Sequence, residues 1–199
     1  YYKPRMDKEI LRKHSAGIIA LSGCLGGELS QTIMRGDMNK TDELVREYQD
    51  IFGKENYFIE IQNYGNVQGG KEVREGLIKL SKKLNTPLVA TIDSHYPNKD
   101  DRKAHDTLLS IQTKSDIKDE NKFSFGDGDY SFVNAEEAIE LFKDIPEAVA
   151  NTMKIAAMCN LELELKKWVF PDFKVEDGKN YDEKLRELTY AGFSRLKLK

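Results

Sequence analysis

The stretch YFIEIQNYGNVQGGKEVREGLIKLSKKLNTPLVATID, residues 57–93, decides the fold class. It opens with an apolar run at 57–62 and closes with another at 87–93, and such short runs are typical of buried strands. Between them, residues 70–85 carry apolar side chains at the spacing of one helix face. Two strands joined by a helix of this length predict parallel strands with the helix packed outside the sheet.

The same alternation continues on both sides of this stretch. A third apolar run, GIIALSG at 17–23, precedes an amphipathic segment at 39–53, for which we expect Thr41 as the N-terminal cap and Gly53 as the end. Another helical pattern follows at 100–112. This order predicts an α/β fold in which the carboxyl ends of the strands share one face. In such folds the functional residues lie on that face.

The pattern changes after residue 113. Residues 113–132 are polar and rich in turn formers, so we expect a long loop there. Two helices are predicted at 134–144 and 145–160, the first capped by an asparagine and the second starting at a proline. Residues 161–180 are expected to be extended, and a final amphipathic helix is predicted at 180–196.

Composition sets broad limits on function. The chain has 199 residues, 33% of them charged, and a net charge of −3, which argues against a basic duplex-binding surface. No apolar run approaches the roughly 20 residues of a membrane helix. Two cysteines make no disulfide framework and favour a reducing, cytoplasmic setting. The charged start without Met predicts no signal peptide and suggests a piece of a longer protein.

Each predicted strand delivers a possible metal ligand near its carboxyl end. Cys24 follows the first strand, Glu60 lies in the second, and Asp93 and His95 close the third. Alternate strand residues share a face, so Asp93 and His95 can point the same way. A thiolate and an imidazole favour Zn²⁺, and carboxylates admit Mn²⁺ or Fe. These residues are candidates for a shared metal site.

The same residues also have structural explanations. Cys24 stands among small residues, where a free cysteine often serves as a small buried hydrophobe. Asp93 and His95 can form a structural hydrogen bond or cap the following helix. Glu60 can ligate a metal directly or orient a ligand by hydrogen bonding. The spacing alone leaves these alternatives open.

Other residues suggest no separate site. Packing or helix-surface exposure explains His105, the helix dipole explains His14, and a core position is expected for Cys159. The glycine-rich SGCLGGELS, residues 22–30, matches neither a P-loop nor a dinucleotide fingerprint. Phosphate binding by those mechanisms is therefore unsupported.

Several stretches together closely resemble the family of bacterial DNA polymerase III alpha subunits. They are YYKPRMDKEIL (1–11), GIIALSGCLGGELS (17–30), YFIEIQNYG (57–65), PLVATIDSHYPNKDDRKAHDTLLSIQT (87–113), PEAVANTMKIAAMCNLELEL (146–165) and FPDFKVEDGKNYDEKLRELTYAGFSRL (170–196). The stretches follow the order of the family and cover nearly the whole chain. One departure is Asn63-Tyr64-Gly65, where members often carry Asn-His-Gly.

The resemblance implies a fold and a set of ligands. Residues 1–160 are similar to the C-terminal part of a PHP (polymerase and histidinol phosphatase) domain, a distorted seven-stranded β/α barrel. Residues 161–199 resemble a mainly helical, incomplete connector into the polymerase palm. The late metal ligands of the family, a Cys after Ser-Gly and an Asp-x-His after the last strand, match Cys24, Asp93 and His95. Earlier ligands are expected before Tyr1 and the polymerase aspartates beyond Lys199.

The resemblance also implies a function. It points to a fragment of a replicative DNA polymerase, a nucleotidyltransferase, whose PHP domain is a metal-dependent phosphoesterase linked to 3′–5′ proofreading. Implied cofactors are Zn, Mn or Fe in the PHP site and Mg for polymerisation. Implied partners are DNA, deoxynucleotides and other replicase subunits, with no membrane. The alternatives are a non-catalytic PHP scaffold of the polymerase and a free-standing PHP phosphatase. The fragment alone is expected to be inactive.

Overall fold

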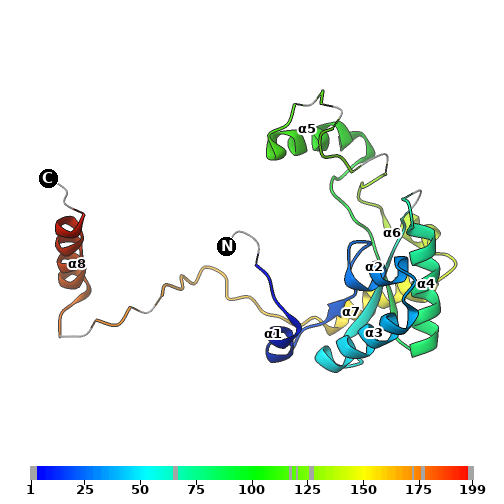
Figure 1. The fold of residues 1–199 in the computed structure, drawn as a ribbon, viewed down its shortest axis with the longest axis horizontal. Coiled ribbons are helices and arrows are strands. Elements are labelled where there is room, and N and C mark those ends of the chain that lie inside the picture. The colour runs from blue at the N-terminus through cyan, green and yellow to red at the C-terminus, as the bar shows by residue number, and fades with distance from the viewer. Residues whose placement is uncertain are drawn as a thin grey trace. The chain divides into compact units, whose positions relative to one another are not determined.

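The computed structural model describes residues 4–64, 67–116, 118–119, 121–125, 128–171, 173–175 and 178–196. A short parallel sheet lies in the first part of the chain (Figure 1). The strands follow the order β1 (Ala20–Leu21), β2 (Tyr57–Gln62) and β3 (Leu88–Thr91). Both neighbouring pairs are parallel. The predicted α/β class with parallel strands is therefore confirmed, whereas the seven-stranded barrel stays a prediction.

The sheet buries one face against helices. Tyr57, Ile59 and Ile61 alternate along β2 and are at most 1% exposed, as expected for side chains that point to one side of a strand. Leu88 and Ala90 of β3 join the same core cluster. Ile59 pairs with Leu88 and Ile61 with Ala90, so the register places these apolar residues side by side.

Three helices supply the other half of this core (Figure 1). They are α2 (Glu28–Met34), α3 (Met38–Phe52) and α4 (Gly70–Leu84). Their buried apolar residues are Leu29, Ile33, Leu44, Val45, Val73, Leu77 and Leu80. The apolar stripes expected from the sequence for α3 and α4 thus face the sheet. This is the packing that buries the continuous apolar runs of parallel strands.

The first part of the chain corrects two expectations. Helix α2 was not predicted, because its glycine-rich N-terminal flank reads as a loop. The cap of α3 is Asp37, whose carboxylate accepts a hydrogen bond from Lys40 N, and not Thr41. Thr41 instead lies within the helix as a buried residue, and its hydroxyl donates a hydrogen bond to Asp37 O. Gly53 ends α3 as predicted.

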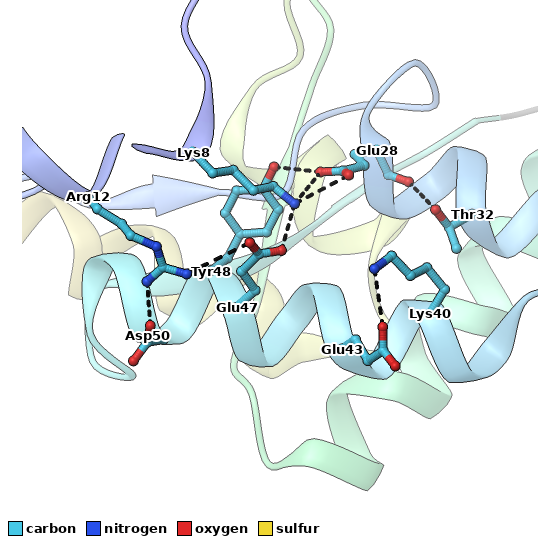
Figure 2. Close-up of polar contacts among 9 residues, drawn as sticks. All are labelled: Lys8, Arg12, Glu28, Thr32, Lys40, Glu43, Glu47, Tyr48 and Asp50. Carbon is cyan, nitrogen blue, oxygen red and sulfur yellow. Dashed lines mark hydrogen bonds and ion pairs between the residues drawn. The ribbon is translucent and has the colours of Figure 1, made fainter. Parts of the chain in front are cut away.

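A cluster of polar contacts ties α1 (Lys8–Lys13) to α2 and α3 (Figure 2). Lys8 Nζ donates to Glu47 Oε2 at 2.7 Å and pairs with Glu28 Oε2 at 3.1 Å. The Tyr48 hydroxyl donates to Glu28 Oε2 at 2.8 Å. Arg12 pairs with Asp50 at the other end of this contact. Five charged side chains and one phenol therefore anchor a short helix that buries no residue of its own.

The helices after β3 follow the expected order. A single 3₁₀ turn, η1 (Lys99–Asp101), leads into α5 (Arg102–Thr113), and α6 (Ala135–Leu141) and α7 (Pro146–Met158) follow. Asn134 and Glu137 form a capping box at the start of α6, as its asparagine predicts. Helix α7 packs against β3: Ala148 is fully buried, and Asn151 Nδ2 donates to Leu88 O at 2.7 Å.

The chain divides into two compact units, 1–160 and 161–199. The second contains α8 (Tyr181–Arg195), which begins at a capping box formed by Asn180 and Glu183. Assigning these units to a PHP domain and a palm connector stays a prediction. No helix within the described part of the chain has the length and apolar content needed to cross a membrane.

Candidate metal centre

Asp93 and His95 lie just beyond the end of β3 and contact each other. The Asp93 Oδ1 and His95 Nε2 atoms are 3.0 Å apart. Both side chains reach solvent, with 50% of Asp93 and 31% of His95 exposed. The two-residue spacing thus brings the pair together, as the sequence predicts. A carboxylate beside an imidazole nitrogen, open to solvent, can hold a divalent cation or form a structural hydrogen bond.

Glu60 lies in β2 and is held by two neighbours on the same face of the sheet. Its Oε1 accepts hydrogen bonds from Thr91 Oγ1 at 2.6 Å and from Gln62 Nε2 at 3.0 Å. Gln62 Nε2 also reaches Thr91 Oγ1 at 3.3 Å. Glu60 is therefore fixed in direction, with one carboxylate oxygen committed to the sheet. This arrangement suits an orienting residue better than a free ligand.

Cys24 lies in the turn between β1 and α2, and its thiol is free and exposed. Gly27 N donates to Cys24 O at 2.9 Å and closes this turn. A Cβ at Gly27 would lie 2.8 Å from Ser22 O, so only glycine fits there. The tight turn fixes the backbone that carries the thiol. The expectation that small neighbours bury Cys24 is wrong.

Tyr64 follows β2 and is buried near Glu60 and Cys24. Burial is the main cause that raises the pKa of Tyr64 to about 12, and the charges of Glu60 and Cys24 act in the same direction. Tyr64 is 7% exposed and belongs to the core cluster. The neighbouring Gly65 of the departing motif lies outside the described residues.

The donor chemistry fits a divalent transition metal, although the described residues supply it only in part. A thiol, a carboxylate and an imidazole are the ligand types that Zn²⁺, Mn²⁺ and Fe take. Among the residues that the structure describes, however, no group of three or more His, Cys, Asp or Glu side chains converges. Asp93 and His95 form the nearest approach to a site, and Cys24 lies apart from that group.

Rings surround His95, and sequence reasoning missed two of them. The ring centroids of Phe125, His105 and Tyr130 lie 4.4, 5.5 and 5.7 Å from that of His95. The packing explanation for His105 is confirmed, because its side chain is 14% exposed and its ring also contacts Tyr96 at 5.4 Å. Phe125 and Tyr130 come from the expected loop, where the only sequence signal was the density of aromatic residues.

The structure assigns no ligand role to His14 or Cys159. His14 caps α1, its backbone N–H donating to Ile10 O and Leu11 O at the helix C-terminus. The core position expected for Cys159 is wrong: the residue follows α7 and is exposed. Among the residues that the structure describes, Cys159 belongs to no group of three or more His, Cys, Asp or Glu side chains that could hold a metal ion.

The family model for the PHP domain matches residues 1–64 of the chain. The DNA polymerase III alpha subunit of Deinococcus radiodurans is 41% identical over 198 residues, which cover 96% of this chain and 15% of the relative. The resemblance to DNA polymerase III alpha subunits is confirmed. The alpha subunit of Thermus aquaticus is 38% identical over 98% of the chain and 16% of the relative. The alpha subunit of Treponema pallidum is 36% identical over 96% of this chain and 16% of the relative.

The chain spans only about one sixth of the length of the alpha subunits it matches, as the 15% to 16% coverage shows. The match nevertheless runs through both compact units. A similarity confined to the first unit would also fit a free-standing PHP protein. Its extension through the second unit favours a polymerase.

Proposed function

We propose that the chain is part of a bacterial replicative DNA polymerase, an alpha subunit of DNA polymerase III, and that residues 1–160 form part of its PHP barrel. The alpha-subunit match over 96% of the chain supports this proposal most directly. The parallel β1-β2-β3 sheet is what a piece of a β/α barrel contains. Residues 161–199 then lead into the palm. The whole protein carries out nucleotidyl transfer in the cytoplasm. It uses DNA, deoxynucleotides and Mg²⁺, and it assembles with the other replicase subunits.

Within that protein, Asp93, His95 and Cys24 contribute ligands to a Zn, Mn or Fe site. The 3.0 Å contact between Asp93 Oδ1 and His95 Nε2 carries this part of the proposal. Further ligands come from parts of the polymerase outside these 199 residues. Glu60 orients the strand ends through its bonds to Thr91 and Gln62.

The chemistry is metal-dependent phosphodiester hydrolysis, a 3′–5′ exonuclease activity that serves proofreading. When bound, divalent ions lower the pKa of a coordinated water and neutralise phosphate charge. In the forms of carboxylate, neutral imidazole and thiolate, Asp93, His95 and Cys24 would hold the metal ion and would not donate protons. Their exposed positions leave room for a phosphodiester to approach. The isolated 199-residue chain is inactive, since its described residues supply an incomplete ligand set.

The test uses the full-length polymerase with His95→Ala and, as a matched control, His14→Ala, which removes an exposed histidine at the end of α1. We expect His95→Ala to bind fewer metal ions per chain and to lose 3′–5′ hydrolysis, and His14→Ala to behave as wild type. Unchanged metal stoichiometry in His95→Ala would overturn the ligand assignment.

A structural scaffold is the second candidate. Asp93 Oδ1 and His95 Nε2 already serve as each other's hydrogen-bond partner. The described residues bring no third ligand to this pair. If the domain only supports the polymerase, Asp93→Asn lowers the thermal stability of the full-length protein, and wild type shows neither bound metal nor exonuclease activity. The match through the second unit disfavours the third candidate, a free-standing phosphatase.

A further inference from the structure

The imidazole of His95 is enclosed by rings that come from two separate segments of the chain. Phe125 is the nearest, with its ring centroid 4.4 Å from that of His95 at an interplanar angle of 46°. His105 of α5 lies at 5.5 Å and Tyr130 at 5.7 Å. The Asp93 carboxylate contacts Nε2, whereas the rings lie against the imidazole. The Asp93 carboxylate therefore restricts the position of the His95 nitrogen, and the surrounding rings restrict the rotation of its imidazole.

The enclosing rings also support one another. Phe125 lies 5.4 Å from His105 and 5.2 Å from Tyr130, between ring centroids. The Tyr130 hydroxyl donates to Phe125 O at 3.2 Å. Pairs of aromatic rings at such distances attract each other beyond the area they bury. His95 is thus one member of a packed set of rings, and a change at one member reaches the others.

Backbone contacts tie the same region to the end of β3. His95 N donates to Tyr130 O at 2.8 Å, and Phe132 N donates to Tyr96 O at 2.9 Å. Tyr96 and Ser131 form an isolated parallel bridge. Tyr130 N also donates to the Tyr96 hydroxyl at 3.0 Å. The backbone of His95 is therefore held by the segment that also carries the Tyr130 ring, so loss of the ring packing should loosen this bridge.

Helix α5 turns one specific residue toward this set. His105 is 14% exposed at its side chain, while Leu108 and Ile111 on the same helix are 64% and 69% exposed. Helix α5 thus leaves two large apolar residues exposed while most of the His105 side chain is covered, so apolar burial alone does not explain which side of the helix is covered. The contact between His105 and the rings of His95, Tyr96 and Phe125 is what α5 presents to the strand end.

We propose that His105 and Phe125 are positioning residues that hold the His95 imidazole in the orientation in which its nitrogen, beside Asp93, receives a metal ion. The metal part of this inference rests on the proposed function. A ligand that is already fixed loses little freedom on binding, so its metal affinity is higher. His105 acts through its ring shape and contacts. It is not itself a ligand.

The test compares His105→Ala, His105→Phe, Phe125→Ala and the control Leu108→Ala in the full-length polymerase. His105→Phe keeps a ring but removes both nitrogens, and Leu108→Ala changes an exposed residue of the same helix. The measurements are Zn²⁺ affinity by competition with a chelator, the visible absorption of Co²⁺ bound in place of Zn²⁺, and hydrogen exchange of the metal-free protein over residues 93–97.

We expect His105→Ala and Phe125→Ala to bind Zn²⁺ about ten-fold more weakly, the lower end of what loss of a ligand-orienting residue costs. Their Co²⁺ absorption shifts, and His105→Phe and Leu108→Ala match wild type in both measurements. In the metal-free protein, exchange over 93–97 rises in the two alanine variants alone.

Three outcomes overturn the inference. Wild-type affinity in His105→Ala and Phe125→Ala shows that the rings do not position His95. Equal loss in His105→Phe and His105→Ala shows that a nitrogen of His105 is itself a ligand. Unchanged metal-free exchange in both alanine variants shows that the rings do not restrain the strand end. A wild-type protein without bound metal, by contrast, refutes the proposed metal site, and the exchange measurement then still decides whether His105 and Phe125 hold His95.

Discussion

The Thr91 hydroxyl on β3 donates a 2.6 Å hydrogen bond to Glu60 Oε1 on the neighbouring strand β2. The bond crosses between parallel strands and fixes a carboxylate inside a sheet. Gln62, which pairs in register with Thr91, donates to the same oxygen. A charge in a half-buried sheet position is tolerated because these two donors replace the water it has lost.

The first prediction removes the Thr91 donor with the isosteric change Thr91→Val. We expect it to lower the free energy of unfolding by about 1 to 2 kcal/mol, because a hydrogen bond to a charged group is lost while the carboxylate stays half-buried. Urea unfolding followed by far-UV circular dichroism measures this change. The control is Thr107→Val on α5, whose exposed hydroxyl reaches only Lys103 O and whose loss should cost under about 0.5 kcal/mol. Equal effects at both sites would contradict the role given to Glu60.

The second prediction concerns two helical glycines in opposite surroundings. A Cβ at Gly76 of α4 would lie 2.8 Å from Ile33 Cγ2, whereas a Cβ at Gly192 of α8 meets no atom within 4 Å. Alanine is favoured over glycine in a helix by up to about 1 kcal/mol. Gly192→Ala should therefore stabilise α8, seen as slower hydrogen exchange over residues 181–195.

Gly76→Ala should have the opposite sign, because overpacking against a branched side chain in a buried site costs about 1 to 3 kcal/mol. We expect a lower urea midpoint for this variant. A midpoint at or above that of wild type would show that α2 and α4 are not in the close contact seen between Ile33 and Gly76.

The third prediction uses the titration of Tyr48. Burial first, and then the hydrogen bond to Glu28, raise the pKa of Tyr48 to about 12 from its ordinary value of 10.0. The folded chain therefore keeps this proton more tightly than the unfolded chain. Tyr48 contributes stability that is complete below pH 10 and is lost as the pH rises from 10 to 12.

Tyr48→Phe removes this titration, so its urea midpoint should fall less between pH 10 and 12 than that of wild type. The control Tyr190→Phe changes a tyrosine that is 67% exposed on α8 and should keep the wild-type slope. A wild-type slope in Tyr48→Phe would show that the titration of Tyr48 does not cause this loss of stability.

Glu28 gives the same contact the opposite pH dependence. Partial burial raises the pKa of Glu28, but the hydrogen bonds from Tyr48 and Lys8 outweigh it and lower the pKa below 4.5. Glu28 thus contributes stability above pH 4.5 that is lost as the pH falls through its lowered pKa. Because Tyr48→Phe removes one of these bonds, the variant should lose less stability than wild type on acidification.

Much of the fold follows from the periodicity of the sequence. The strand at 57–62 coincides with β2, and the helix at 70–85 differs from α4 by one residue. Local capping chemistry also sufficed where it was strong, as at Asn134. Expectations failed at α2, a short helix that follows a glycine-rich stretch, and at the start of α3, where two polar residues four positions apart could act as the cap. There the choice between Asp37 and Thr41 depends on which of them the core buries.

The candidate site also has a part that the sequence predicts and a part that it does not. The contact of Asp93 with His95 is local, so strand alternation predicts it. The rings of Phe125 and Tyr130 reach His95 from about 30 residues away in the sequence, as the numbering shows. No local pattern encodes that approach. The sequence did not predict the exposure of Cys24 and Cys159 for a related reason. Burial depends on which elements pack over a residue, and no local pattern encodes that packing.

The last prediction uses the two exposed thiols as a test and its internal control. In full-length polymerase loaded with Zn²⁺, alkylation of Cys24 by a maleimide should be at least about ten-fold slower than in chelator-treated protein, because a metal-bound thiolate is no longer a free nucleophile. Cys159, exposed after α7, should react at the same rate in both. Mass spectrometry of the two peptides measures each rate separately. If Zn²⁺ slows both cysteines equally, the effect is a general change of the protein. If it slows neither while metal is bound, Cys24 is not a ligand of that metal.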